Sequence, residues 1–117
     1  MARQDRAITY VAATMKKTAG VLLARSLKER LLRRGYPIRQ VYLFGSVAQG
    51  TAREDSDVDI AVICDPFLPS KHDENVQFLL MGNHVNLRIE TVCLHPADFQ
   101  NKYFTLAREI ERTGVEV

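Results

Sequence analysis

Two short apolar runs, joined through a glycine, constrain this chain more than any other feature. The first run, Gln40 to Phe44, ends directly at Gly45, and the second, Asp57 to Cys64, is rich in valine and isoleucine. Short runs of this composition, bounded by glycine or proline, are typical of β-strands. The sequence therefore predicts two strands, with a short helix over residues 46–52 between them.

Amphipathic helices are predicted around these strands. Between Val21 and Leu32, apolar residues recur at helical spacing, and Gly35 followed by Pro37 ends the pattern. The remaining predicted elements are helices over 73–81 and 103–112, a helical turn opening at Pro96, a third strand over 85–94 and an edge strand over 115–117. Because helices and strands are intermixed, the expected fold class is α/β (α+β), with a small mixed β-sheet flanked by helices.

Glycine positions predict where some elements break. Gly20 is expected to separate a weak helix over 7–15 from the helix that follows, and Gly82-Asn83 is expected to form a turn. The length of 117 residues suits one domain with a modest core. Residues 1–117 are therefore predicted to form a single domain, in which residues 1–19 make a loosely packed N-terminal helix.

Composition excludes several classes of protein. The chain has 16 Lys and Arg against 14 Asp and Glu, a net charge of +2, which does not favour nucleic acid as the main partner. Basic residues concentrate in the first 40 positions, which fits either a solvated helix face or a basic rim that attracts phosphate or an acidic partner. No apolar stretch is long enough to cross a bilayer and no signal-peptide pattern opens the chain, so a cytoplasmic protein without a membrane role is expected.

The cysteines and histidines carry no local ligand pattern. Cys64 and Cys93 both lie inside apolar runs and outside any Cys-x-x-Cys pair, so they are predicted to be buried thiols in a reducing compartment, with a disulfide as the alternative. The three histidines, His72, His84 and His95, are predicted to be surface or loop residues.

Asp57 and Asp59 are the first candidates for chemistry. Alternate residues of a strand point to the same face, so the two carboxylates are expected side by side, about 6 to 7 Å apart. Two like charges on one face repel each other, but carboxylate oxygens are the ligands that Mg²⁺ prefers. The pair fits either a magnesium site or the polar outer face of an edge strand.

Gly45-Ser46 stands eleven positions upstream of this pair, where the first strand runs into a predicted helix start. Unpaired backbone N–H groups at a helix start attract an anion, glycine permits a close approach, and the Ser46 hydroxyl adds a donor. Gly-Ser alone fits a simple capped turn. Its position before Asp57 and Asp59 instead predicts one element that holds phosphates and another that holds the metal bridging them.

The stretch Leu43-Phe-Gly-Ser-Val-Ala-Gln-Gly-Thr-Ala-Arg-Glu-Asp-Ser-Asp-Val-Asp-Ile60 resembles the signature of the polymerase beta-like nucleotidyltransferase superfamily, and within it the minimal nucleotidyltransferase domains. The signature reads Gly-Ser, a glycine four residues on, then Ser-Asp-x-Asp and an apolar residue. The resemblance implies that Gly45 and Ser46 hold the β- and γ-phosphates of a nucleotide and that Asp57 and Asp59 bind metal.

The family usually has a third acidic residue on a later strand, which completes the metal site and helps to activate the acceptor hydroxyl. Glu90 is the candidate, because Arg88-Ile89-Glu90 resembles the Arg-Ile-Glu of one branch of these domains. The alternatives are that Glu90 is an exposed carboxylate paired with Arg88 or Arg53, or that Asp98 fills the third position.

Two further residues of the motif region are candidates for nucleotide binding. Ser56 belongs to the Ser-Asp-x-Asp element, and Arg53 precedes it in the loop, where it is placed to contact a phosphate. The chain also departs from the family pattern. Val47 replaces the arginine that many members carry after Gly-Ser, and a glutamate replaces the usual third aspartate.

The resemblance implies a transferase that uses Mg²⁺, with two ions expected, and ATP or another nucleoside triphosphate. It would transfer the nucleoside monophosphate, expected to be AMP, to a hydroxyl acceptor and release pyrophosphate. Minimal domains of this kind resemble the antitoxin of two-gene pairs, so a HEPN-like toxin with a modifiable tyrosine is the expected protein partner. The alternative is a catalytically weak or inactive antitoxin that acts as a binding module by protein contact.

Overall fold

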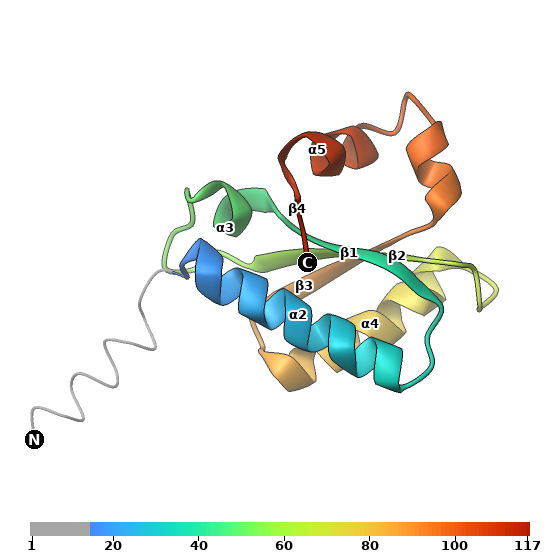
Figure 1. Cartoon of the computed structure of the whole chain (residues 1–117), viewed down its shortest axis with the longest axis horizontal. Coiled ribbons are helices and arrows are strands. Elements are labelled where there is room, and N and C mark those ends of the chain that lie inside the picture. Colours follow the sequence, from blue (N-terminus) through green and yellow to red (C-terminus); the bar gives the residue numbers. More distant parts are fainter. Residues whose placement is uncertain (1–14) are drawn as a thin grey trace, which may run out of the picture.

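Four strands form one mixed sheet in the order β3-β2-β1-β4 (Figure 1). The computed structural model describes residues 15–117, and the helix predicted over 7–15 lies outside the described residues but for Met15, which is not helical. The strands are β1 (Ile38–Phe44), β2 (Val58–Cys64), β3 (Ile89–Leu94) and β4 (Val115–Glu116). The predicted α/β class with a small mixed sheet is confirmed.

Strand β2 lies inside the sheet. It pairs antiparallel with β1 and parallel with β3, and the parallel pair is joined through a helix that crosses from one strand to the next. The alternative in which Asp57 and Asp59 decorate an edge strand is therefore wrong. A carboxylate on an interior strand is less accessible to water, so the groups around it determine how readily it carries its negative charge.

Helices cover the two faces of the sheet unequally. Figure 1 shows α2 (Lys17–Arg33) and α4 (Lys71–Val85) on one face, and α5 (Thr105–Thr113) with the short 3-10 helix η1 (Pro96–Gln100) on the other. The larger core cluster lies under α2 and α4, and a smaller one, built on Ala61, Ile63, Leu94 and Ile110, lies under α5. The short helix α3 (Gly45–Gln49) follows β1 directly.

The long helices follow from apolar stripes. Residues Gly20, Ala24, Leu27 and Leu31 of α2 are buried at helical spacing, and so is the stripe of α4 that contains Phe78. Ser70 caps α4, because its hydroxyl accepts the N–H of Asp73 at 3.2 Å. None of the helices within residues 15–117 has the length and apolar content that a bilayer crossing requires.

Two glycines that were predicted to break helices lie inside them. A Cβ on Gly20 would stand 2.6 Å from Cγ1 of Val47, and one on Gly82 would stand 2.8 Å from Cγ2 of Ile89. Both positions therefore serve close helix packing against neighbouring elements. The prediction of a break at Gly20 and a turn at Gly82-Asn83 was wrong, because the missing side chain is needed for contact and not for a bend.

The third strand is shorter than predicted. Helix α4 continues through Val85, and Leu87 lies in the following turn with 86% of its surface exposed, so neither residue belongs to the strand. The alternation of apolar and polar residues that predicted a strand from residue 85 does not correspond to a strand before Ile89. From Ile89 onward the prediction is confirmed, as are the helical turn at Pro96 and the edge strand.

A candidate carboxylate site at the start of β2

Asp59 and Glu90 are partners across the parallel β2–β3 pair. Neighbouring strands lie about 4.8 Å apart, so partners in register hold their side chains next to each other. Asp59 shares its side of β2 with Ala61 and Ile63, which pack in the smaller core cluster beneath α5. The two carboxylates therefore stand together on the α5 face, at the end of the sheet where β2 begins.

Asp57 lies in the turn directly before β2 and is exposed, whereas the prediction had placed it in the strand itself. Its charge nevertheless acts on Asp59, as does the charge of Glu109 from α5. Glu109 was missed at the sequence level, since a glutamate in an amphipathic helix carries no signal of its own. The charges of three other carboxylates thus act on Asp59.

The surroundings of Asp59 disfavour its negative charge. Burial raises the pKa of Asp59 to about 6, and the nearby carboxylates of Glu90, Asp57 and Glu109 act in the same direction. A carboxyl group with this pKa is mostly ionised at pH 7 and takes up a proton as the pH falls toward 6. Such a cluster is stabilised by a cation, and perturbed groups of this kind concentrate at functional sites.

Gly45 brings the backbone against this cluster. Its φ is +72°, a left-handed conformation, and a Cβ at this position would overlap the carboxylate of Asp59. Gly45 is also the first residue of α3, so the unpaired N–H groups of that helix begin beside the carboxylates. The start of α3 therefore lies next to the Asp59 carboxylate.

We expect Gly45→Ala to damage both the site and the fold. The methyl group would strain the left-handed backbone and displace the Asp59 carboxylate, at a cost of about 1 to 3 kcal/mol in the free energy of unfolding. Chemical denaturation measures this loss. Gly35→Ala is the matched control, because Gly35 has a φ of +81° but nothing within 4 Å of its added Cβ. Equal losses in both variants would contradict the proposed clash with Asp59.

The remaining residues of the α3 region divide between site and core. Ser46 is partly exposed beside Gly45, whereas Val47 is fully buried in the larger core cluster. The position that is arginine in many relatives therefore faces the core in this chain, and Val47 fills it by packing against Gly20. The Val47 side chain itself offers no hydrogen-bond donor to a phosphate.

The loop before β2 is held by its own hydrogen bonds. The Ser56 hydroxyl accepts the backbone N–H of Arg53 at 2.7 Å, and the Arg88 guanidinium donates to the Ser56 carbonyl at 2.6 and 3.1 Å. Ser56 and Arg88 therefore position Asp57. The Arg53 side chain is exposed, and within residues 15–117 neither arginine forms an ion pair with Glu90.

Asp98 is the rejected candidate for the third carboxylate. It lies in η1, where its side chain accepts the N–H of His95 at 2.8 Å and forms an ion pair with Lys71 at 3.0 Å. Its charge is thus satisfied at the opposite end of β3 from Glu90. Between the two rivals, the fold brings only Glu90 to Asp59.

Comparison with known proteins decides the family. The family model for polymerase beta nucleotidyltransferases matches residues 26–116. The chain belongs to this nucleotidyltransferase family. No curated protein sequence matches it closely enough to count as a relative.

Solved structures agree on the fold. A protein from Sulfolobus solfataricus, whose description as a nucleotidyltransferase is provisional, is 19% identical with a TM-score of 0.59, over 86% of this chain and 80% of that one. A variant of the MntA–HpeT toxin–antitoxin complex is 18% identical with a TM-score of 0.55, over 80% and 69%. A toxin–antitoxin structure with AMP-PNP is 23% identical with a TM-score of 0.55, over 78% and 69%. At identities this low, the structural similarity establishes the fold alone.

Proposed function

We propose that this chain is an active, Mg²⁺-dependent nucleotidyltransferase that transfers AMP from ATP to a hydroxyl group. The observation that carries the proposal is the position of Asp59, which lies against Gly45 and beside its strand partner Glu90; burial and the charges of Glu90, Asp57 and Glu109 raise its pKa there. Repulsion between these carboxylates destabilises the folded chain, and a site that binds cations together with a polyphosphate would offset this cost.

The donor set fits magnesium. Asp57, Asp59 and Glu90 would hold the ions, because they offer the carboxylate oxygens that Mg²⁺ prefers from the loop before β2, from β2 and from the adjacent position of β3. Bound there, Mg²⁺ would neutralise charge on the triphosphate and favour deprotonation of the acceptor. Glu109 would tune the charge of Asp59 from α5.

The protein's own groups would handle the rest. The backbone N–H groups at Gly45 and Ser46 would receive the β- and γ-phosphates, with Arg53 available from the loop. The acceptor oxygen would form a bond to the α-phosphorus as the bond from that phosphorus to the β-phosphate bridging oxygen breaks. Glu90 would take the hydroxyl proton, and pyrophosphate would leave with the electron pair.

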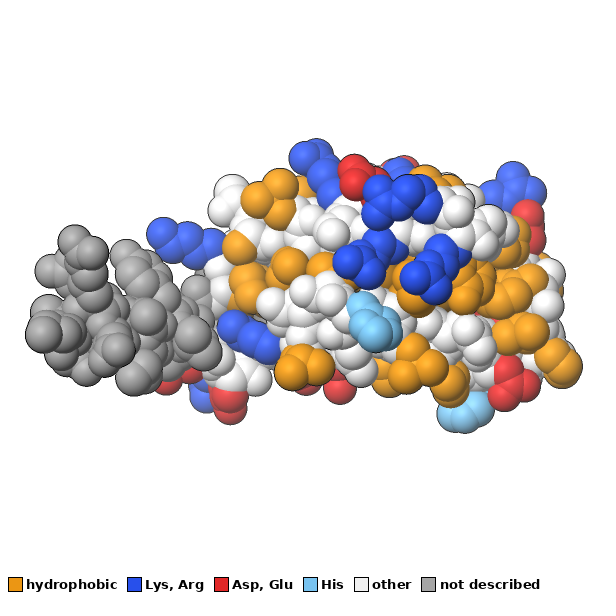
Figure 2. Space-filling model, turned by 90° about the horizontal axis from the view of Figure 1, so that it is seen from below, with side chains coloured by type: hydrophobic (Ala, Val, Ile, Leu, Met, Phe, Trp, Pro, Cys, Tyr) orange, Lys and Arg blue, Asp and Glu red, His pale blue; other side chains and the backbone are white. Residues whose placement is uncertain are grey.

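A protein acceptor suits the molecular surface. Figure 2 shows apolar side chains interleaved with basic ones on the face seen from below, where α2 and α4 lie in Figure 1. The large exposed apolar residues of these two helices are Leu22, Leu32, Val76 and Leu80. Such surface is typical of protein interfaces. Together with the toxin–antitoxin neighbours, it supports a HEPN-like toxin as the partner and a tyrosine hydroxyl on it as the acceptor.

Cation binding should depend on pH through Asp59. Its folded pKa of about 6 exceeds the ordinary value of 3.8, so protons compete with the metal below pH 6. The affinity for Mn²⁺, used as a probe, should rise from pH 5 to pH 7 and then level off. Without metal, the free energy of unfolding should fall as the pH rises from about 4 to about 6, because over this range the unfolded chain has already released the proton that the folded chain still holds. Calorimetry and denaturation measure the two trends, and Asp59→Asn should abolish both.

Label position in ATP tests the reaction. The chain is incubated with Mg²⁺ and the product of its neighbouring gene, once with ATP labelled at the α-phosphate and once at the γ-phosphate. Nucleotidyl transfer leaves the α label on the acceptor protein and releases the γ label in pyrophosphate. Label from the γ position on the acceptor would indicate phosphoryl transfer instead. Neutralisation of the partner with neither label attached would favour the binding module that acts by contact alone.

A further inference from the structure

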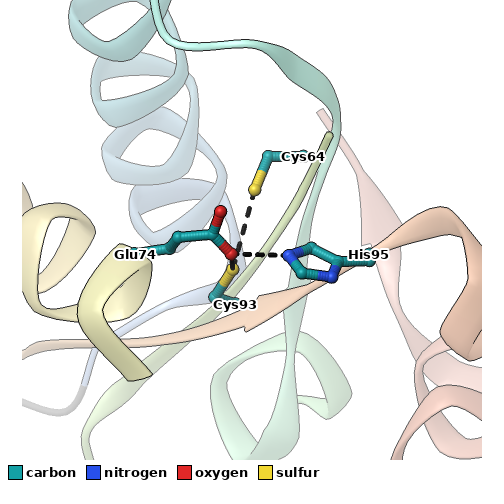
Figure 3. Close-up of side chains that lie close together, drawn as sticks. All are labelled: Cys64, Glu74, Cys93 and His95. Carbon is teal, nitrogen blue, oxygen red and sulfur yellow. Dashed lines mark hydrogen bonds and ion pairs between the residues drawn. The ribbon is translucent and has the colours of Figure 1, made fainter. Parts of the chain in front are cut away.

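A second cluster of metal-binding residue types lies at the other end of β2. Cys64 ends β2, Cys93 lies in β3, Glu74 comes from α4 and His95 follows β3 (Figure 3). One ligand atom from each residue lies within 4.8 Å of the other three. His95 lies in a loop, as predicted, but its side chain turns inward and is only 19% exposed, so the prediction of a surface histidine without ligand neighbours was incomplete.

Two of the distances between these atoms are close to those of a tetrahedral zinc site, and a third is shorter. The Cys64 and Cys93 sulfurs are 3.6 Å apart, and zinc–sulfur bonds of about 2.3 Å would put them about 3.8 Å apart. The Cys93 sulfur lies 3.8 Å from Oε1 of Glu74, against about 3.5 Å in such a site. Nε2 of His95, at 2.5 Å from the same oxygen, would have to retreat by about 0.9 Å.

We propose that Cys64, Cys93, His95 and Glu74 form a structural zinc site, separate from the carboxylates at the start of β2. The donor set decides the metal, because two sulfurs with an imidazole select zinc, whereas magnesium and calcium prefer oxygen alone. Four protein ligands without an open position indicate a structural role and not a catalytic one. The inference does not depend on the transferase activity.

Glu74 is held in place for this role. Its side chain is fully buried, and its second oxygen accepts the N–H groups of Phe67 at 2.6 Å and Leu68 at 3.1 Å. Metal ligands in proteins are commonly oriented in this way by hydrogen bonds from groups that do not bind the metal themselves. The first oxygen remains turned toward the two sulfurs and the imidazole.

Burial works against the thiolate form of both cysteines unless a cation is bound beside them. Burial raises the pKa of Cys64 to about 11 and raises that of Cys93 further, so both thiols are protonated when no metal is bound. A divalent ion reverses this preference, because it stabilises the two thiolates directly. Zinc would then join the ends of β2 and β3 to α4, three elements that are far apart in the sequence.

Metal content and cobalt spectroscopy test the site. The full chain is purified without chelator, and bound zinc is measured by mass spectrometry; we expect about one equivalent. Replacement by Co²⁺ should give the intense visible bands of a tetrahedral ion together with a thiolate charge-transfer band. Cys64→Ser and Cys93→Ser should each weaken zinc binding at least 10-fold and reduce the charge-transfer band.

Matched controls separate this site from others. His84→Ala removes an exposed histidine and should leave zinc binding unchanged, and so should Asp57→Asn with Asp59→Asn, which removes the proposed magnesium ligands. Circular dichroism identifies any variant that fails to fold, in which case His95→Gln replaces it. Zinc that remains after both cysteine substitutions would overturn the proposal. So would an unreduced chain 2 Da lighter than its sequence mass, because a Cys64–Cys93 disulfide would then be the function of the pair.

Discussion

Replacing Asp57 and Asp59 together with asparagine is expected to lower AMP transfer by a factor of about 1000 or more. The substitution keeps the size of both side chains and removes the two charges that would hold Mg²⁺ against the triphosphate. Losing a single preorganised electrostatic contact commonly costs about 100- to 1000-fold in rate, and here two are lost. Label transfer from ATP at saturating Mg²⁺ measures the effect.

The fold should survive this double substitution. Val58 and Ile60 carry the core packing on the other face of β2 and are unchanged. Removing the Asp59 charge removes both the cost of burying it and its repulsion by the neighbouring carboxylates, so the free energy of unfolding at pH 8 should stay equal or increase. An inactive variant of undiminished stability is the combination expected of a catalytic site. A loss of stability equal to that of a core variant would show instead that the two aspartates serve the fold.

Asp55→Asn is the matched control. Asp55 is exposed in the same loop, so its substitution removes one negative charge without touching the cluster around Asp59. We expect transfer within about 2-fold of the unchanged chain. If Asp55→Asn were as inactive as the double variant, the general negative charge of the loop, and not a metal site at Asp57 and Asp59, would explain the loss.

The sequence predicted the candidate residues within the Gly45–Asp59 motif better than the residues that other elements bring to the same site. Gly45 and Asp59 lie in one short motif, and both the close approach and the shared strand follow from local spacing. That Glu90 stands beside Asp59 depends on the register of a parallel pair whose strands are joined through a helix. Such a register is set by packing across the whole sheet, so it could be proposed only by resemblance. Glu109 reaches the site from a helix with no motif at all.

The same reasoning explains the residues that were misjudged. Gly20 and Gly82 have the local signature of helix breaks, but tight packing against Val47 and Ile89 requires a residue without a side chain. Local propensity is a weak prior, and tertiary contact overrides it. For His95 the sequence offered one nearby ligand type, Cys93 two residues earlier, but Cys64 and Glu74 come from another strand and from a helix, so the cluster could not be assembled from local spacing.

Glu74→Ala is expected to be the most destabilising single substitution discussed for this chain. Glu74 lies on the buried side of α4. One of its oxygens accepts the N–H groups of Phe67 and Leu68, and the other contacts the ring of His95. The alanine variant leaves these partners without an acceptor and leaves a cavity in the core. Unsatisfied donors and lost packing together should lower the free energy of unfolding by about 2 to 4 kcal/mol.

This loss must be measured with a chelator present, because the buried carboxylate is required with or without zinc. Although burial works against its charge, the N–H groups of Phe67 and Leu68 and the His95 ring lower the pKa of Glu74 below its usual value, so the folded state stabilises the carboxylate itself. Glu74→Gln keeps one acceptor oxygen and should lose less than the alanine variant. Asp73→Ala, one position earlier on an exposed side of α4, should cost under about 1 kcal/mol. Equal losses at positions 73 and 74 would mean that helix-start charge, and not a buried hydrogen-bond network, explains why an acidic residue stands at Glu74.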